Sequence, residues 1–165
     1  MAEPAPPANA RQILLQRIYL KDASLEVPLA PQVFARQWNP NLDVQVGSGA
    51  SALGNDLYQV LLTVTATAKL GEDVGFLAEV HQAGIFQITG FAEAELPALL
   101  SAYCPNLVFP FAREAVAELV QRAGFPPLLL QPINFDALFA EHVARARAEA
   151  AANADKANDG GARLQ

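Results

Sequence analysis

The chain has 165 residues, the length of a single domain, and carries a formal net charge of −6. Proteins that bind a nucleic-acid backbone need clustered Lys and Arg, so this acidic balance argues against nucleic acid and favours a basic partner. Hydrophobic residues make up 52% of the chain and charged residues only 17%. This surplus of apolar residues indicates surface that is hidden in an oligomer or offered to partners.

The chain contains no recognisable targeting or membrane segment. Residues 1–10 include Glu3 and three prolines but no apolar core, which excludes a secretory signal. No apolar run reaches the length of about eighteen residues that a membrane span needs. The single cysteine, Cys104, cannot form a disulfide within the chain. These features predict a cytoplasmic protein that does not insert into a membrane.

Composition divides the chain into three parts. Residues 1–11 are rich in Pro and Ala and are predicted to be disordered. Residues 12–150 carry strand and helix patterns and are predicted to form one domain. The end of the chain is rich in Ala without an apolar stripe, and residues 151–165 are predicted to be a disordered tail.

Four segments have the character of β-strands, namely 13–27, 42–46, 57–70 and 74–88. The small and polar segment 47–54 is predicted to be a loop. A short Gly-containing turn joins the last two strands into a hairpin. Because no helix separates the strands, they are predicted to form an antiparallel sheet.

The second half of the chain is helical in pattern. Residues 92–100 are a weak helical segment, and 111–123 form a strong amphipathic helix that ends at Gly124. The stretch 103–111 is apolar and contains two prolines, which fits neither a central strand nor an ordinary surface loop. Asn134 is a suitable N-cap for a last helix. The predicted fold is α+β, with a four-stranded antiparallel sheet and the C-terminal helices packed on one face.

Catalysis would have to use Cys104 with His81 or His142. Cys104 lies in apolar company, where a thiol is protonated and inert. No His, Cys, Asp or Glu spacing indicates a metal site, and no Gly-rich phosphate loop is present. The sequence therefore predicts no enzyme, no metal and no cofactor. Two alternatives remain. One is a small-molecule enzyme with an unrecognised site, and the other is an adaptor oligomer whose apolar surface is entirely buried between its own subunits.

Two pairs of residues are candidates for a docking patch. Asp22 and Glu26 share one face of the first strand, and Leu77 and Glu79 share one face of the fourth. Solvated charge that keeps strands from aggregating is the competing interpretation, and the pattern alone favours it.

Aromatic residues offer a similar choice. Trp38 lies between Pro31 and Pro40, either as a plug on the edge of the core or facing a ligand. The pattern does not decide which residues of the wider aromatic set belong to the core and which line an exposed groove. It comprises Phe34, Trp38, Tyr103, Phe109, Phe111, Phe125, Phe135 and Phe139.

Several motifs between about Gln16 and Phe139 carry a family resemblance. They are Gln16-Arg17-Ile18-Tyr19, Lys21-Asp22, Gly84-Ile85-Phe86, Tyr103-Cys104-Pro105-Asn106-Leu107, Phe109-Pro110-Phe111-Ala112-Arg113-Glu114, Gly124-Phe125-Pro126 and Pro132-Ile133-Asn134-Phe135-Asp136-Ala137-Leu138. Together they resemble the SecB protein-export chaperones. The resemblance implies an ATP-independent chaperone that holds preproteins unfolded in the cytoplasm and delivers them to the SecA translocation ATPase. It also implies a homotetramer built as a dimer of dimers.

The resemblance assigns roles to residues of this chain. It implies that the SecA-binding residues are Asp22, Glu26, Leu77 and Glu79. It implies a groove for unfolded clients, for which the expected residues are Phe34, Trp38, Tyr103, Phe109 and Phe135. Ala78, Val80 and Gln82 share one strand face and are expected at the oligomer interface, where bulky or charged replacements should split the assembly. The Ala- and Arg-rich end after Phe139 departs from the family and has no assigned role.

Overall fold

The computed structural model describes residues 10–160, with side chains as far as Lys156. Four long strands come first: β1 (Gln12–Glu26), β2 (Asn41–Gly54), β3 (Leu57–Leu70) and β4 (Asp73–Thr89). A 3-10 helix (Gln32–Ala35) lies in the connection between β1 and β2. After β4 come a 3-10 turn (Glu93–Glu95), α1 (Leu96–Ala98), a π-helical turn (Leu99–Tyr103), α2 (Cys104–Arg122) and α3 (Phe135–Gly160). Strands followed by helices confirm the predicted α+β class.

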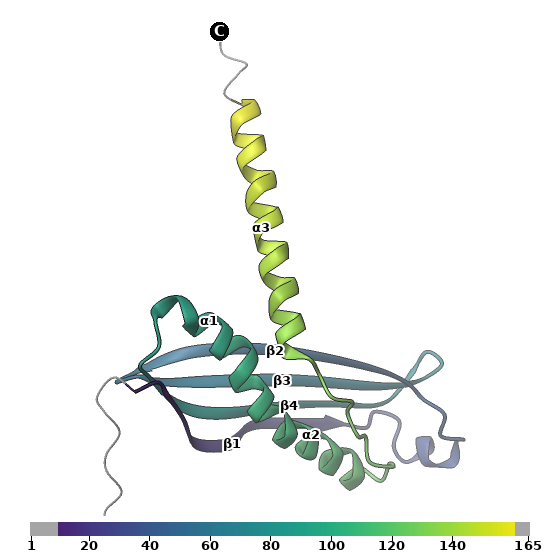
Figure 1. Cartoon of the computed structure of the whole chain (residues 1–165). Coiled ribbons are helices and arrows are strands. Elements are labelled where there is room, and N and C mark those ends of the chain that lie inside the picture. Colours follow the sequence, from purple (N-terminus) through teal and green to yellow (C-terminus); the bar gives the residue numbers. More distant parts are fainter. Residues whose placement is uncertain (1–9, 161–165) are drawn as a thin grey trace, which may run out of the picture.

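The strands form one antiparallel sheet in the order β1-β4-β3-β2 (Figure 1). A two-residue turn joins β2 to β3, and its residues Asn55 and Asp56 have positive φ values of 53° and 59°. Such values suit a tight hairpin, and Asn and Asp tolerate them better than most residues. Gly71, with φ of 67°, makes the turn between β3 and β4 and confirms the predicted hairpin. Within the chain, β1 and β2 are the two edges of the sheet.

β2 is much longer than the predicted strand 42–46. The segment 47–54, predicted to be a loop, continues the strand and pairs with β3 as far as Gly54. Glycine, serine and alanine have low strand propensity, but ladder hydrogen bonds use the backbone alone. The regular neighbour β3 offers a complete ladder, so tertiary pairing overrides the local preference.

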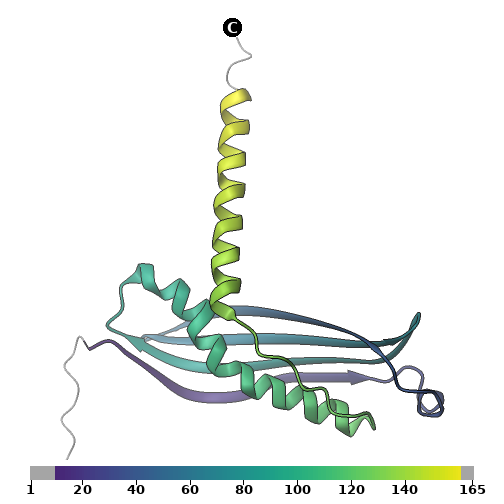
Figure 2. The same cartoon turned by 45° about the vertical axis from the view of Figure 1, so that its right-hand side comes forward.

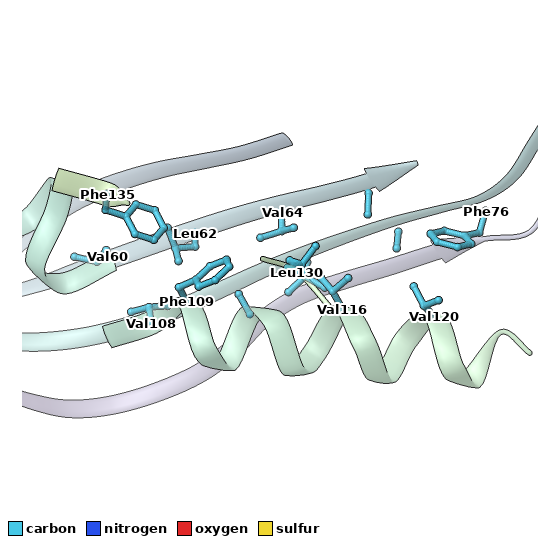
Figure 3. Packing of buried hydrophobic residues seen from close by; sticks show 14 of the residues in the cluster. Val60, Leu62, Val64, Phe76, Val108, Phe109, Val116, Val120, Leu130 and Phe135 are labelled. Carbon is cyan, nitrogen blue, oxygen red and sulfur yellow. The ribbon is translucent and has the colours of Figure 1, made fainter. Parts of the chain in front are cut away.

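The hydrophobic core lies on one face of the sheet, here called the helix side, where α2 crosses β3 and β4 (Figure 1). Alternate side chains of both strands point to this side and are buried, and α2 adds buried side chains three or four residues apart. Figure 3 shows these rows facing each other, with Val60, Leu62 and Val64 opposite Val108, Val116 and Val120. Burying each such side chain contributes about 1.5–3 kcal/mol, so the two rows hold α2 on the sheet.

α2 begins earlier than the predicted helix 111–123, because the Pro-rich stretch 103–111 is itself helical. Pro105 lies at the start of α2, directly after the π-helical turn, so its missing N–H falls where the backbone hydrogen bonding changes from the π-helical to the α-helical pattern. Pro110 lies inside the helix and removes one backbone hydrogen bond. It is exposed, as is Asn106, whose carbonyl would have accepted that bond, so water can replace the lost donor.

α3 starts where the sequence predicted, since the Ala137 N–H donates to Asn134 Oδ1 at 3.0 Å. It continues as a helix through Gly160, in place of the disordered tail predicted from residue 151; residues 161–165 lie outside the described part. Figures 1 and 2 show α3 standing away from the sheet. Only its first turns pack on the core, through Phe135 and Phe139, so α2 alone lies along the sheet face. Alanine-rich sequence sustains the exposed part through its high helix propensity.

The N-terminal prediction of disorder for 1–11 falls mostly on residues 1–9, which lie outside the described part. Arg11 forms an ion pair with Glu95, and its guanidinium lies 4.7 Å from the centre of the Phe91 ring. These contacts join the start of β1 to the first helical turns. Among residues 10–160, none of the helices is both long and apolar enough to cross a membrane.

Candidate functional site

An acidic surface lies on the face of the sheet opposite α2, here called the open side. Asp22 of β1 pairs with His81 of β4, and Glu26 of β1 pairs with Leu77 of β4. Side chains of directly paired residues project to the same side of a sheet, and Glu79 lies between Leu77 and His81 on that side. The structure thus brings Asp22, Glu26, Leu77 and Glu79 together, which the sequence could not do because the sheet order is not readable from it.

Two further residues belong to this surface. Asp43 of β2 pairs with Thr67 of β3, which pairs with Leu77, so one row crosses the sheet from Asp43 to Glu26. An exposed acid thus lies at each end of a row that contains Leu77. His81 is the second addition, one alternate position beyond Glu79. We define the acidic face as Asp22, Glu26, Asp43, Leu77, Glu79 and His81. Alternation within 42–46 already predicts that Asp43 points to the other side of the strand from Leu42 and Val44. Only the register shows that Asp43 lies in the same row as Leu77.

Glu79 accepts hydrogen bonds from two neighbouring side chains on the open side. His81 Nε2 lies 2.6 Å from Glu79 Oε1, and the Thr65 hydroxyl donates to Glu79 Oε2 at 3.2 Å. These hydrogen bonds, with that from His81 the stronger cause, lower the pKa of Glu79 below its ordinary value. Hydrogen bonds to a carboxylate favour its charged form. Glu79 therefore keeps its negative charge to lower pH than an isolated glutamate.

Four aromatic rings gather at one end of the helix side. Trp38 packs on Phe125 and Phe76 with ring centroids 4.3 and 5.9 Å apart, and Phe34 lies 5.3 Å from Phe125. Gly75 permits this arrangement, because a Cβ there would lie 2.9 Å from the Trp38 ring. Trp38 is half-buried and caps the core edge, whereas Phe34 remains 51% exposed. In this cluster Trp38 covers the edge of the core, and Phe34 offers an accessible aromatic surface.

Tyr103 is exposed but lies away from this cluster. It directly precedes α2, whereas Phe125 follows the end of α2, and the helix between them is about 28 Å long at about 1.5 Å per residue. Tyr103 instead shares the outer face of α2 with Leu107 and Phe111, at spacings of four residues, and all three are exposed. The structure does not join Tyr103 to Phe34 and Trp38 in one groove.

Two residues expected in the client groove belong to the core instead. Phe109 is 5% exposed and Phe135 is 2% exposed, and their rings meet edge to face with centroids 5.8 Å apart. Phe109 points inward because the stretch 103–111 is a helix whose inner face rests on the sheet. Phe135 is drawn in at the first turn of α3. Phe109 therefore offers almost no surface to a client, and Phe135, although nearly buried, forms part of the wall of the open cavity at the start of α3.

Ala78, Val80 and Gln82 lie on the helix side of β4 and are buried, with exposed fractions of 0%, 0% and 4%. Gln82 is the only polar residue among the buried side chains described. These three residues share one face, as the alternation predicted, but that face is covered by the chain itself. Replacements at these buried positions could affect contacts with another copy only by displacing α2. Their effect on assembly stays a prediction.

α2 leaves part of the helix side uncovered beside it. Leu42, Val44 and Val46 of β2 point to this side, since they pair with core-facing residues of β3, and the first two are 44% and 39% exposed. Beyond Val46 an open cavity of about 440 Å³ leads to Leu138 at the start of α3, and polar side chains of α3, among them Glu141 and Arg145, also line it. We call Leu42, Val44, Val46 and Leu138 the apolar row. It extends along β2 from the segment that follows Trp38 towards the start of α3, and the sequence pattern did not predict it as a site.

The residues available for catalysis do not assemble. Cys104 is fully buried on the helix side, and burial raises the pKa of its thiol to about 12. His81 lies on the open side, and His142 is on α3. Within residues 10–160, no cluster of three or more His, Cys, Asp or Glu side chains is arranged to hold a metal ion.

Comparisons with known proteins agree on one family. The family model described as "Preprotein translocase subunit SecB" matches residues 7–146. The protein-export protein SecB of Psychrobacter cryohalolentis is 51% identical over 143 residues, covering 87% of this chain and 95% of that protein. The protein of the same name from Methylococcus capsulatus is 49% identical over 140 residues, covering 85% and 90%.

Among solved structures, the fold is similar to that of a SecB-like chaperone of Mycobacterium tuberculosis in complex with an antitoxin peptide. The TM-score is 0.62, with 20% identity over 73% of this chain and 90% of that chain. At this identity the likeness concerns the fold alone, and it agrees with the predicted architecture. The family match confirms the sequence prediction of a chaperone and not an enzyme. This chain belongs to the SecB family of protein-export chaperones.

Proposed function

We propose that this chain holds preproteins unfolded in the cytoplasm without ATP and delivers them to the SecA translocation ATPase. The observation that carries the proposal is that two unlike surfaces lie on opposite sides of one sheet. The apolar row lies on the helix side, and the acidic face lies on the open side. A protein that must hold one partner while docking on another needs surfaces that both partners can occupy at once.

Client binding is assigned to the apolar row, with Phe34 and Trp38 at the end of the row near Leu42. Hydrophobic burial is non-directional, so such a row accepts many apolar segments of an unfolded chain. The SecB-like relative from Mycobacterium tuberculosis, which was solved with a bound peptide, supports a peptide-binding role. Because a single row buries little area, tight holding requires several rows that act on one client, as in an oligomer.

SecA docking is assigned to the acidic face. An exposed ion pair contributes about 0.2–1 kcal/mol, so no single carboxylate suffices. Asp22, Glu26 and Glu79 lie around Leu77, which adds an apolar centre to the charges. This arrangement suits a basic segment of the partner, and its affinity must fall with salt because exposed charges are screened.

A homotetramer, built as a dimer of dimers, accounts for the apolar surface that remains. Leu15 and Leu20 of β1 point to the helix side and are 42% and 50% exposed, and Leu107 and Phe111 lie exposed on α2. Closed symmetric assemblies cover such patches by pairing identical surfaces. A second copy that packs on β1 and α2 would leave the apolar row of β2 free for clients.

The proposal is tested by separating the two functions with paired variants. Leu42→Asp with Val44→Asp should greatly reduce suppression of client aggregation, measured without nucleotide at equal subunit concentration. The same variant should bind SecA normally. Asp22→Lys with Glu79→Lys should do the reverse, holding clients while losing SecA binding in low salt. Gln45→Asp is the control for the first pair, since it alters the same strand on the other side.

Two outcomes would overturn the assignments. If the β2 pair holds clients as well as wild type, the apolar row is not the client surface. If the charge-reversed variant binds SecA normally in low salt, the acidic face is only solvated charge. A wild-type protein that fails to suppress aggregation would favour the adaptor alternative, in which all apolar surface serves self-assembly.

A further inference from the structure

The chain contains two histidines, and one of them, His81, lies within the acidic face. Its imidazole is about one quarter exposed and lies in the row that Asp22 also occupies. A residue that can carry positive charge is unexpected within a surface whose proposed partner is basic. Protonation of His81 therefore makes this part of the surface less negative.

Hydrogen bonds connect His81 to β3 and to Glu79. Thr63 Oγ1 lies 3.5 Å from His81 Nδ1, and His81 Nε2 lies 2.6 Å from Glu79 Oε1. In the neutral form, a proton on Nε2 lets the ring donate to Glu79 while Nδ1 accepts from the Thr63 hydroxyl. In the charged form both nitrogens donate, and Thr63 becomes the acceptor. Both forms thus keep Glu79 oriented, and only the net charge differs.

We propose that His81 is a positioning residue of the SecA-docking surface, which orients Glu79 and, when protonated, weakens docking of the basic partner. The inference rests on the proposed docking function of the acidic face. Imidazoles change charge between about pH 5 and pH 8, so the effect falls within a range that cells and assays reach. A protonated His81 places one positive charge beside the carboxylates that attract the basic partner.

The surroundings of His81 contain more acids than bases. On β4 its neighbour on the open side is Glu79, on β1 its partner is Asp22, and on β3 its partner is the uncharged Thr63. The nearest bases belong to β1: Lys21 at the bulge beside Asp22, and Arg17, opposite Ile85 further along the strand. A proton on His81 thus offsets the charge of the carboxylates that make up the docking surface.

The test compares affinities for SecA of wild type, His81→Gln and His81→Lys in low salt across about pH 5.5 to pH 8. SecA titrates as well, so the informative quantity is the ratio of each variant's dissociation constant to that of wild type at the same pH. Wild type should weaken about threefold to fivefold relative to His81→Gln as the pH falls, the size expected for one exposed charge. His81→Lys should bind weakly at every pH.

A second comparison separates orientation from charge. At pH 8, His81→Gln keeps a donor for Glu79 and should bind as wild type does, while His81→Ala removes the donor and should bind about twofold more weakly. Thermal unfolding of each variant checks that the fold is kept. A constant ratio of His81→Gln to wild type across the pH range overturns the inference while leaving docking intact. If wild type itself fails to bind at pH 8, docking and the inference fall together.

Discussion

The two sides of the sheet differ although the same strands build both. On the helix side, β3 and β4 present Val, Leu, Ala and Phe side chains that α2 seals from water. On the open side, the same strands present Thr63, Thr65, Glu79 and His81, joined by side-chain hydrogen bonds. Substitutions at neighbouring positions of one strand therefore have different consequences. Those on the helix side affect stability, and those on the open side affect recognition of a partner.

Val80→Arg should produce the largest effect, because it puts a charge under α2 where Val80 is 0% exposed. A buried unpaired charge costs about 3 kcal/mol or more, so thermal unfolding should shift strongly and the oligomer should split as α2 is displaced. Sedimentation measures the assembly. Glu79→Gln, one residue away on the open side, is the matched control and should change neither. Equal effects of both variants would contradict the two-sided description.

Cys104→Ala should have a moderate effect on stability and none on function. Cys104 is fully buried, and removing its sulfur leaves a small cavity that costs about 1 kcal/mol. Chemical denaturation measures the loss, and aggregation assays should give wild-type client holding. Loss of holding in a folded Cys104→Ala protein would instead point to chemistry at the thiol.

Asp43→Lys should weaken SecA binding about twofold to fivefold in low salt without changing stability, because Asp43 is an exposed acid in the row of Leu77 and Glu26. Binding measured at two salt concentrations checks that the loss is electrostatic. Gln45→Lys, the next position on the same side of β2, measures how far the surface extends. Unchanged binding of Asp43→Lys would restrict the acidic face to β1 and β4.

Thr65→Val should produce the smallest effect, a rise in the pKa of Glu79 towards its ordinary value. The Thr65 hydroxyl donates to Glu79 and helps to lower that pKa. A carboxyl group whose pKa is lowered by folding stabilises the folded state at pH values above its pKa in the unfolded chain. This stabilisation is lost as the pH falls through its pKa in the folded state. The variant should therefore lose the charge of Glu79 at higher pH, which carboxyl chemical shifts can follow. Thr67→Val, on the same side of β3, is the control and should leave that titration unchanged.

Much of the architecture was readable from local pattern. Alternation along 57–70 and 74–88 separated the buried side chains from the polar ones, because successive residues of a strand point to opposite sides. The Asn134 cap likewise marked the start of α3 correctly. The stretch 103–111 was not read as a helix, because its prolines argued against regular structure, and their tolerated positions become visible only when the helix is placed.

The sequence by itself determined the family, the fold class and which residues share a side of each strand, because these follow from motifs and local periodicity. Only the tertiary structure decided which sides coincide, since strand register depends on pairing between distant segments. That register brought Asp43 to the row of Leu77 and placed Asp22 beside His81. Packing under α2 also withdrew Phe109 and Phe135 from the surface, because burial is a property of what lies against a residue and not of the residue type.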